Sequence, residues 1–268
     1  MNTVRDIEPT RLVPAVQSAC RILDLLAHGD GEAPSLSEIA RDLELSKSSV
    51  HGLLTTLNAY GYVQRGADSR RYRLGAALVP LGRAAAGNLR AAALIGDRLA
   101  ALAGEHRLTF AVAQVTEYGD AQVIDRAYPR SDIHVGVALG SRYGPFEGAI
   151  GKCLIAAMDE AEAKRLVHGA DIPRHTGLTL AEPDALLADI DRVRALGWAS
   201  SMGELKENHA VAAPLHGAGG DVELVLFAVG FPRQLDADAI AAIGAVLRET
   251  AAAIRAELGA TVHERGRA

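Results

Sequence analysis

The stretch that decides the fold runs from Pro34 to Gly61 and reads PSLSEIARDLELSKSSVHGLLTTLNAYG. It contains two helix starts. Ser35, followed three residues later by Glu38, forms a capping box, and Ser46 is a good N-cap for a second helix. Apolar residues recur at helical spacing after each start, and Gly61 supplies the stop expected beyond the second helix. The pattern predicts two short helices joined by a tight turn.

The second helix turns a polar surface away from its apolar stripe. The side chains on this surface are small or can form hydrogen bonds, and none of them is a carboxylate. The recognition helix of a DNA-binding protein places such residues against base edges, while hydroxyls and a lysine at its start hold phosphates. The alternative is a capped, solvated helical hairpin of a kind that many globular domains contain. The residues of the hairpin expected to contact DNA are Ser35, Ser37, Ser46, Lys47, Ser48, Ser49, His51 and Thr55.

Two short strands are predicted directly after the hairpin, over 62–65 and 70–74, around the turn Gly66-Ala67-Asp68-Ser69. A helical hairpin followed at once by such a ribbon is a winged helix-turn-helix. Residues 41–83 hold an excess of four positive charges in a chain whose net charge is −5. Because a basic patch on an acidic protein is typical of a DNA-binding surface, we expect double-stranded DNA as a partner. The wing residues expected to contact it are Arg70, Arg71 and Tyr72.

Composition narrows the remaining function classes. The 268 residues are 49% hydrophobic, which is ample for a core in one or two domains. The sequence shows neither an apolar signal region nor a run of roughly 18 apolar residues, so we expect a cytoplasmic protein with no membrane partner. Cys20 and Cys153 lie far apart without further ligands nearby, so no disulfide, metal site or cofactor is expected. Cys20 falls on the apolar face of a helix that begins at Pro14 and is expected to be a small core residue.

The second half of the chain changes its periodicity twice. Alanine-rich helical sequence extends to Arg107, and its helix over 89–106 is either a dimer seam or the ordinary first helix of a second domain. Strands and helices then follow in the order strands, helices, strands, which predicts an α+β domain on an antiparallel sheet. The expected strands are 109–116, 121–127, 133–139, 198–201, 210–215 and 222–231; the expected helices are 153–157, 160–168, 183–196 and 236–258.

The chain resembles the IclR family of bacterial transcriptional regulators over nearly its whole length. The matching segments are SLSEIARDLELSKSSVHGLLTTLNAYGYV, RRYRLGAALVPLG, GAIGKCLIA, GWASSMGELK and AVAAPLHGAGG. The resemblance implies a GAF-like effector-binding domain, dimers built through the DNA-binding half, and dimers of dimers, that is homotetramers, on DNA. The expected organisation is a flexible arm over 1–12, a winged helix-turn-helix domain over 13–75, a linker helix over 76–88, the GAF-like domain over 89–260 and a tail over 261–268.

The resemblance also implies which residues line the effector pocket. They are the small residues before a Gly-Lys pair, a polar stretch after a Gly-aromatic pair, and positions on two later strands. In this chain they are Ala149, Ile150, Gly151, Ser201, Met202, Ala210, Ala228 and Gly230. Relatives that bind small oxo-acids tend to have an acidic run at 200–204 and serines at the last two positions. Because this chain lacks that acidic run and those serines, its pocket is less polar. The expected effector is therefore a small organic acid, with an aromatic carboxylate preferred to an oxo-acid.

Two enzymatic interpretations compete with a regulator. Cys153, beside Lys152 near a helix start, could have a lowered thiol pKa with His168 or His175 as its base, or it could be a small buried residue. The residues Glu204, Lys206, Glu207 and His209 could form a catalytic or metal cluster, or a solvated loop at the pocket rim. We expect no enzyme, but a ligand-responsive transcription factor. The alternative is a winged-helix protein whose second domain mediates only oligomerisation.

Overall fold

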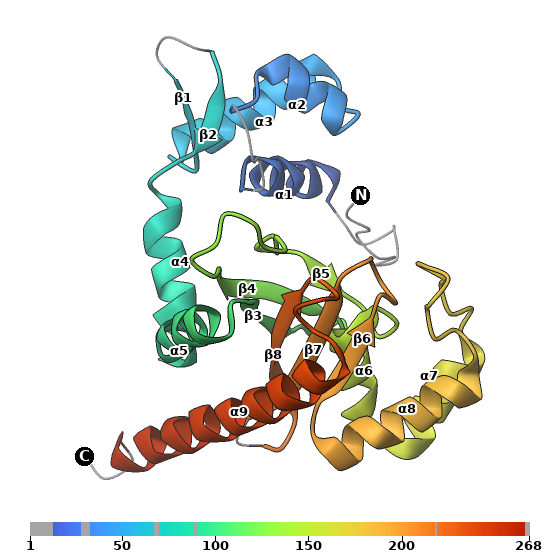
Figure 1. Cartoon of the computed structure of the whole chain (residues 1–268). Coiled ribbons are helices and arrows are strands. Elements are labelled where there is room, and N and C mark those ends of the chain that lie inside the picture. Colours follow the sequence, from blue (N-terminus) through green and yellow to red (C-terminus); the bar gives the residue numbers. More distant parts are fainter. Residues whose placement is uncertain (1–12, 28–32, 67–69, 88–89, 218, 266–268) are drawn as a thin grey trace. The chain divides into compact units, whose positions relative to one another are not determined.

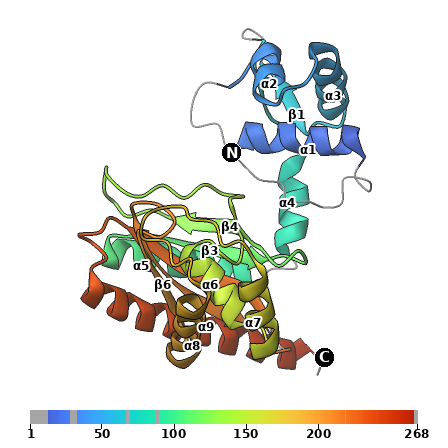
Figure 2. The same cartoon turned by 90° about the vertical axis from the view of Figure 1, so that its right-hand side faces the viewer.

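The computed structural model describes residues 13–27, 33–66, 70–87, 90–217 and 219–265. The chain divides into two compact units, Met1–Leu89 and Arg90–Ala268, and each is described by itself (Figures 1 and 2). The arm expected over 1–12 and the wing-turn residues 67–69 lie outside the described residues. Within the described ranges, no helix is both long and apolar enough to cross a membrane.

The N-terminal unit is a winged helix-turn-helix, as predicted. In Figure 2, α2 and α3 lie side by side across α1, and the two wing strands pair antiparallel. Its elements are α1 (Pro14–Ala27), α2 (Leu36–Asp42), α3 (Lys47–Ala59), β1 (Val63–Arg65), β2 (Tyr72–Leu74) and α4 (Leu78–Gly87).

Local hydrogen bonds fix the hairpin as its sequence predicts. The hydroxyl of Ser35 accepts from the amide of Glu38, and the Glu38 carboxylate accepts from the amide of Ser35 at 2.7 Å. At the start of α3 the Ser46 hydroxyl accepts from the amide of Ser49 at 3.1 Å. These caps satisfy amides that have no partner inside their helices, so both starts are set by the nearby sequence.

A close backbone approach joins the wing to the end of α3. A β-carbon at Gly75 would lie 2.0 Å from the carbonyl oxygen of Gly61. Only glycine therefore allows β2 to leave the wing beside the helix end. The core beneath is continuous, because Ile22 of α1, Ile39 of α2 and Val63 of β1 are fully buried in one cluster.

The C-terminal unit is an α+β domain built on one antiparallel sheet, which confirms the predicted fold class. The sheet has six strands in the order β5-β4-β3-β8-β7-β6. Its strands are β3 (Thr109–Val115), β4 (Ala121–Ala127), β5 (Arg142–Tyr143), β6 (Ala199–Met202), β7 (His209–His216) and β8 (Val222–Gly230). Its helices are α5 (Arg90–His106), α6 (Gly148–Ala156), α7 (Glu160–Gly169), α8 (Pro183–Leu196) and α9 (Ala237–Arg265).

Each face of this sheet has its own core. Helices α5 and α9 pack on one face, where Leu226 and Ala228 of β8 are buried with Leu99 of α5 and Leu247 of α9. Helix α6 packs on the other face (Figure 1). Phe227 and Val229 belong to the core on that face. Because side chains alternate along a strand, neighbouring residues of β8 belong to different cores.

Several local predictions were wrong. Residues 133–139 form no strand. They cross one face of the sheet as a loop, tied by a hydrogen bond of 2.7 Å from the Thr109 hydroxyl to the carbonyl of Val135. Helix α6 begins at Gly148, before the predicted start at 153, and α9 continues past the predicted end at 258, to Arg265. Cys20 is exposed, because it lies two residues before Ile22 and so on the opposite side of α1 from the core.

Candidate functional site

Helix α3 presents the polar surface expected of a recognition helix. Lys47, Ser48, His51 and Thr55 are all exposed, and so is Ser37 on α2. Within the described part of the chain, Lys47 and His51 make no side-chain hydrogen bond or ion pair, so both are free to meet a ligand. Ser46 and Ser49 are exposed too, but their hydroxyls bond to each other at 2.8 Å. Ser35 serves the capping box. These three serines organise the helix starts, and their contacts with DNA stay predictions.

The wing residues divide into two kinds. Arg70 is exposed, as predicted for a DNA contact, whereas Tyr72 is 8% exposed and belongs to the core beneath the wing. The prediction of a DNA contact by Tyr72 was therefore wrong, because in strand β2 its side chain alternates inward. Two further exposed arginines, Arg65 and Arg73, were missed as site residues although they contributed to the basic balance.

Arg71 has a structural role. Its guanidinium donates to the carbonyl of Ala33 at 2.6 Å and lies 3.5 Å from the Glu38 carboxylate. The backbone hydrogen bond from Ser35 is the main cause that lowers the pKa of Glu38, and the charge of Arg71 adds to it. Arg71 thus connects the wing to the start of α2, and its contact with DNA stays a prediction.

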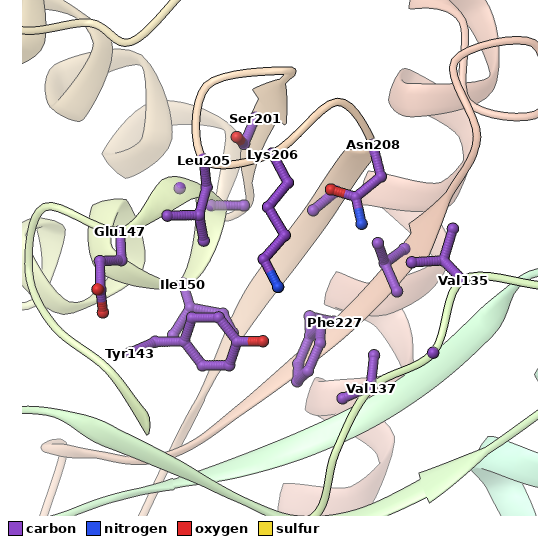
Figure 3. A pocket seen from close by; sticks show the side chains of 15 residues that line it. Val135, Val137, Tyr143, Glu147, Ile150, Ser201, Leu205, Lys206, Asn208 and Phe227 are labelled. Atoms are coloured by element: carbon purple, nitrogen blue, oxygen red, sulfur yellow. The ribbon is translucent and has the colours of Figure 1, made fainter. Parts of the chain in front are cut away.

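A cavity opens on the α6 face of the C-terminal sheet. It measures about 550 Å³ including its opening to solvent. A row of paired residues crosses its floor: Ser201 of β6 pairs with Ala210 of β7, which pairs with Val229 of β8. Figure 3 shows the side chains that surround it. The lining residues are Val135, Gly136, Val137, Tyr143, Glu147, Gly148, Ala149, Ile150, Ser201, Leu205, Lys206, Asn208, Ala210, Phe227 and Val229.

Four of the eight predicted pocket residues line this cavity, namely Ala149, Ile150, Ser201 and Ala210. Gly151 does not, since its backbone packs so closely on the preceding loop that a β-carbon would lie 2.5 Å from the carbonyl oxygen of Pro145. Met202 is also outside the lining and is 43% exposed.

The two predicted positions on β8 were wrong by one residue. Ala228 is fully buried in the core on the α5 and α9 face, and a β-carbon at Gly230 would meet Leu108 of that core. The residues of β8 that line the cavity are Phe227 and Val229. A shift of one residue moves a strand side chain to the opposite face of the sheet. The prediction therefore chose the right strand but residues on its wrong face.

The remaining lining comes from loops that sequence reasoning missed. Val135 and Val137 lie in the segment predicted as a strand, and Tyr143 and Glu147 flank the loop before α6. Leu205, Lys206 and Asn208 belong to the loop between β6 and β7. The only signal for Lys206 was its place in the charged run after Met202, which left a pocket rim and a catalytic cluster as alternatives.

That charged run is not a cluster in the structure. Glu204 points to Lys152, Lys206 lines the cavity, Glu207 is exposed, and His209 has its Nδ1 2.6 Å from the carbonyl of Leu235. Among the described residues, no group of three or more acidic, histidine or cysteine side chains could hold a metal ion.

Cys153 does not have the properties of a nucleophile. It is fully buried, its thiol donates to the carbonyl of Ala212 at 3.5 Å, and burial raises its pKa to about 12. Both histidines considered as its base, His168 and His175, are exposed. A thiol that stays protonated is a weak nucleophile, so the structure favours a small core residue.

A winged helix-turn-helix joined to a sheet domain with a lined cavity defines a two-domain, DNA-binding transcriptional regulator. Two family profiles match the chain: "Bacterial transcriptional regulator IclR C-terminal" over residues 84–256 and "IclR helix-turn-helix domain" over residues 15–67. The chain belongs to the IclR family. Its N-terminal domain binds DNA and its C-terminal domain is the family's effector-binding domain.

Named relatives are regulators and not enzymes. The glycerol operon regulatory protein of Streptomyces griseus is 32% identical over 93% of this chain and 98% of its own. The transcriptional regulator KdgR of Escherichia coli is 27% identical over 91% of this chain and 94% of its own.

Solved structures share the fold. An IclR transcriptional regulator from Alicyclobacillus acidocaldarius has a TM-score of 0.76 at 29% identity, over 91% of this chain and 98% of that one. An IclR homologue from Microbacterium hydrocarbonoxydans, solved in complex with 4-hydroxybenzoate, has a TM-score of 0.73 at 23% identity, over 92% of this chain and 99% of that one.

Proposed function

We propose that this regulator binds operator DNA as a homodimer or a dimer of dimers, and that a small organic acid in the C-terminal cavity switches that binding. The observation that carries the proposal is the composition of the cavity. Phe227, Val229, Ile150 and Val137 supply apolar surface, and polar groups come from Tyr143, Glu147, Ser201, Lys206 and Asn208. A site of this kind binds an apolar body and fixes its orientation with a small number of polar contacts.

The same composition supports an aromatic or otherwise apolar acid over a small oxo-acid. A small oxo-acid exposes polar oxygens on most of its surface, and each oxygen buried without a partner costs free energy. The structural relative from Microbacterium hydrocarbonoxydans is a complex with 4-hydroxybenzoate, and this makes 4-hydroxybenzoate a sensible first probe.

For the DNA-binding half we propose that α3 enters the major groove with Lys47, Ser48 and His51 near bases or phosphates, while Arg70 of the wing contacts the backbone. The two DNA-binding domains of a dimer must meet half-sites that lie about one helical turn, or a multiple of it, apart. Ligand occupancy would act by changing the geometry of the dimer and hence the fit to those half-sites.

The experiment uses the full chain. Operator sites are first selected from random duplex DNA, and the affinity for the selected site is measured with and without acids at millimolar concentration. A change in operator affinity with 4-hydroxybenzoate or a related acid supports the proposal. If calorimetry detects no acid binding and no acid changes operator affinity, the C-terminal domain of this chain serves oligomerisation only.

A further inference from the structure

We propose that Lys206 selects the charge of the ligand, so that the cavity takes an acid with a single carboxylate and an apolar body. The carboxylate lies at the mouth against Lys206, and the apolar body points inward to Phe227. This inference rests on the proposed function, because it takes the cavity to be the effector site.

The inner wall of the cavity is apolar and shaped by two aromatic rings. Tyr143 and Phe227 meet edge to face, with ring centroids 6.2 Å apart and planes at 65°. Burial, and secondarily the charge of Glu147, raises the pKa of Tyr143, so its hydroxyl stays neutral. The inner end therefore suits an apolar or weakly polar group and offers no cation to a carboxylate.

Among the described residues that line the cavity, Lys206 is the one permanent cation. Its side chain is exposed, and in Figure 3 it points toward Tyr143 and Phe227. Within the described ranges, no carboxylate oxygen lies within 4.0 Å of its ammonium group. An ammonium at the mouth of an apolar cavity is therefore available to an anionic ligand.

The carboxylates nearest to Lys206 in the sequence and in the cavity are committed elsewhere. The Glu204 carboxylate lies 2.7 Å from the Lys152 ammonium. The Glu147 carboxylate accepts from the amide of Gly144 at 2.5 Å. Because both already have hydrogen-bond partners, neither is free to neutralise Lys206, and its charge is left for the ligand.

The loop that carries Lys206 is held at its start by hydrogen bonds from the segment 176–179. The Glu204 carbonyl accepts from the Thr179 hydroxyl at 2.6 Å, and the Gly203 carbonyl accepts from the Thr176 hydroxyl at 2.7 Å. The amide of Gly203 donates to the carbonyl of Asn208 at 3.3 Å, which closes the loop at its base. Lys206 therefore projects from an anchored turn, so its position over the mouth is built into the fold.

The charge balance sets the class of ligand. One carboxylate can pair with Lys206 in a charge-assisted hydrogen bond, which is stronger than a neutral one. A second carboxylate at the inner end would meet apolar surface and the negative charge of Glu147, so dicarboxylates are rejected. A neutral amide of the same shape keeps the apolar contacts but loses the charge pairing.

The test is calorimetric titration of the full chain with matched probes. The acids are benzoate, 4-hydroxybenzoate, phenylacetate and cyclohexanecarboxylate, the neutral probes are their amides, and the dicarboxylate is terephthalate. The variants are Lys206→Met, Lys206→Arg as the charge-preserving variant, and Glu207→Gln as a control on the adjacent exposed position of the loop. A melting curve for each variant verifies that it is folded.

We expect at least one monocarboxylate to bind the parent at least tenfold more tightly than its amide. Lys206→Met should weaken that acid by about tenfold to a hundredfold and leave the amide unchanged, as a charge-assisted hydrogen bond predicts. Lys206→Arg should retain most of the affinity, and Glu207→Gln all of it.

Three outcomes overturn the inference. An acid that binds Lys206→Met as tightly as the parent shows that another group holds the carboxylate, and preferred binding of terephthalate shows that the cavity takes two charges. In both cases the proposed function stands, because an acid still occupies the site. The third outcome is that no acid binds at a concentration of about 10 mM, so that any dissociation constant is weaker than about 10 mM. The inference and the acid-responsive function then fail together.

Discussion

Lys152 and Glu204 form a buried ion pair, with the ammonium and a carboxylate oxygen 2.7 Å apart and the lysine side chain 5% exposed. Asp189 of α8 lies at 2.7 Å from the same ammonium, and the carbonyl of Ser200 accepts from it at 2.8 Å. One side chain on α6 therefore satisfies acceptors on α8, on β6 and on the loop before β7. Both α6 and that loop line the cavity, so the pair fixes the position of one cavity wall relative to the other.

Replacing this lysine should destabilise the C-terminal unit strongly. Lys152→Met leaves the Glu204 carboxylate without its cation in a buried site, whereas Asp189 keeps its ion pair with Arg192. Breaking a buried pair costs about 3–5 kcal/mol. Urea unfolding followed by the fluorescence of Trp198, the one tryptophan of the sequence, which packs against this unit's core, measures the loss. Lys164→Met is the matched control, since Lys164 forms an exposed pair with Glu160 and its loss should be too small to measure. Equal unfolding curves for Lys152→Met and the parent would rule out the stabilising role.

Replacing the wing arginines one at a time should distinguish those that contact DNA from the one that stabilises the fold. Arg70→Ala and Arg73→Ala remove exposed cations, so each should weaken operator and non-specific DNA alike and reduce the salt dependence by about one unit of slope per lost phosphate contact. Both variants should melt like the parent. The measurement is operator affinity at two or more salt concentrations.

Arg71→Ala provides the contrast, because its guanidinium holds the carbonyl of Ala33 and the Glu38 carboxylate. This variant should lower the melting temperature of the N-terminal unit and leave the salt dependence of DNA binding nearly unchanged. A wild-type melting curve together with a reduced slope would return Arg71 to the DNA interface.

The pKa of Cys153 predicts its chemical behaviour. Burial raises this pKa to about 12, so below pH 10 the thiol is protonated, and its burial also blocks reagents. In a Cys20→Ser variant, which removes the exposed cysteine, Cys153 should react with a disulfide reagent at pH 8 only after denaturant is added. Rapid labelling of the native variant would show that the thiol is accessible and would reopen the nucleophile interpretation.

The parts of the fold that sequence predicted well are those set by neighbouring residues. The capping box of Ser35 and Glu38 and the N-cap of Ser46 placed both hairpin helices. Pro183 at the first turn placed the start of α8. Each signal acts within a few residues of the boundary it sets, so no knowledge of the tertiary structure was needed.

The parts that sequence missed depend on distant partners. Whether Phe227 or Ala228 faces the cavity is decided by the register of β8 against β3 and β7, which a strand pattern that is apolar on both faces does not reveal. Val135 and Val137 alternate like a strand but cover the cavity as a loop. The burial of Lys152 depends on Glu204, far along the chain, and the sequence around Lys152 gives no sign of it.

Two alanines on neighbouring strands give the sharpest test of the cavity. Ala210 of β7 lines it, whereas Ala228 of β8, which pairs with the adjacent Val211, is fully buried in the core on the other face. Ala210→Leu should fill the ligand space and reduce acid affinity at least tenfold, while the melting temperature stays near that of the parent.

Ala228→Leu should do the opposite. Overpacking a well-filled core costs about 1–3 kcal/mol, so this variant should melt at a lower temperature and, once folded, respond to the acid with nearly unchanged affinity. The two measurements are a melting curve and a calorimetric titration with the monocarboxylate that binds the parent most tightly. The same substitution thus has two predicted outcomes that differ only in the face of the sheet on which it falls. If Ala228→Leu abolished acid binding without loss of stability while Ala210→Leu did not, the ligand would lie on the α5 and α9 face, and the assigned cavity would be wrong.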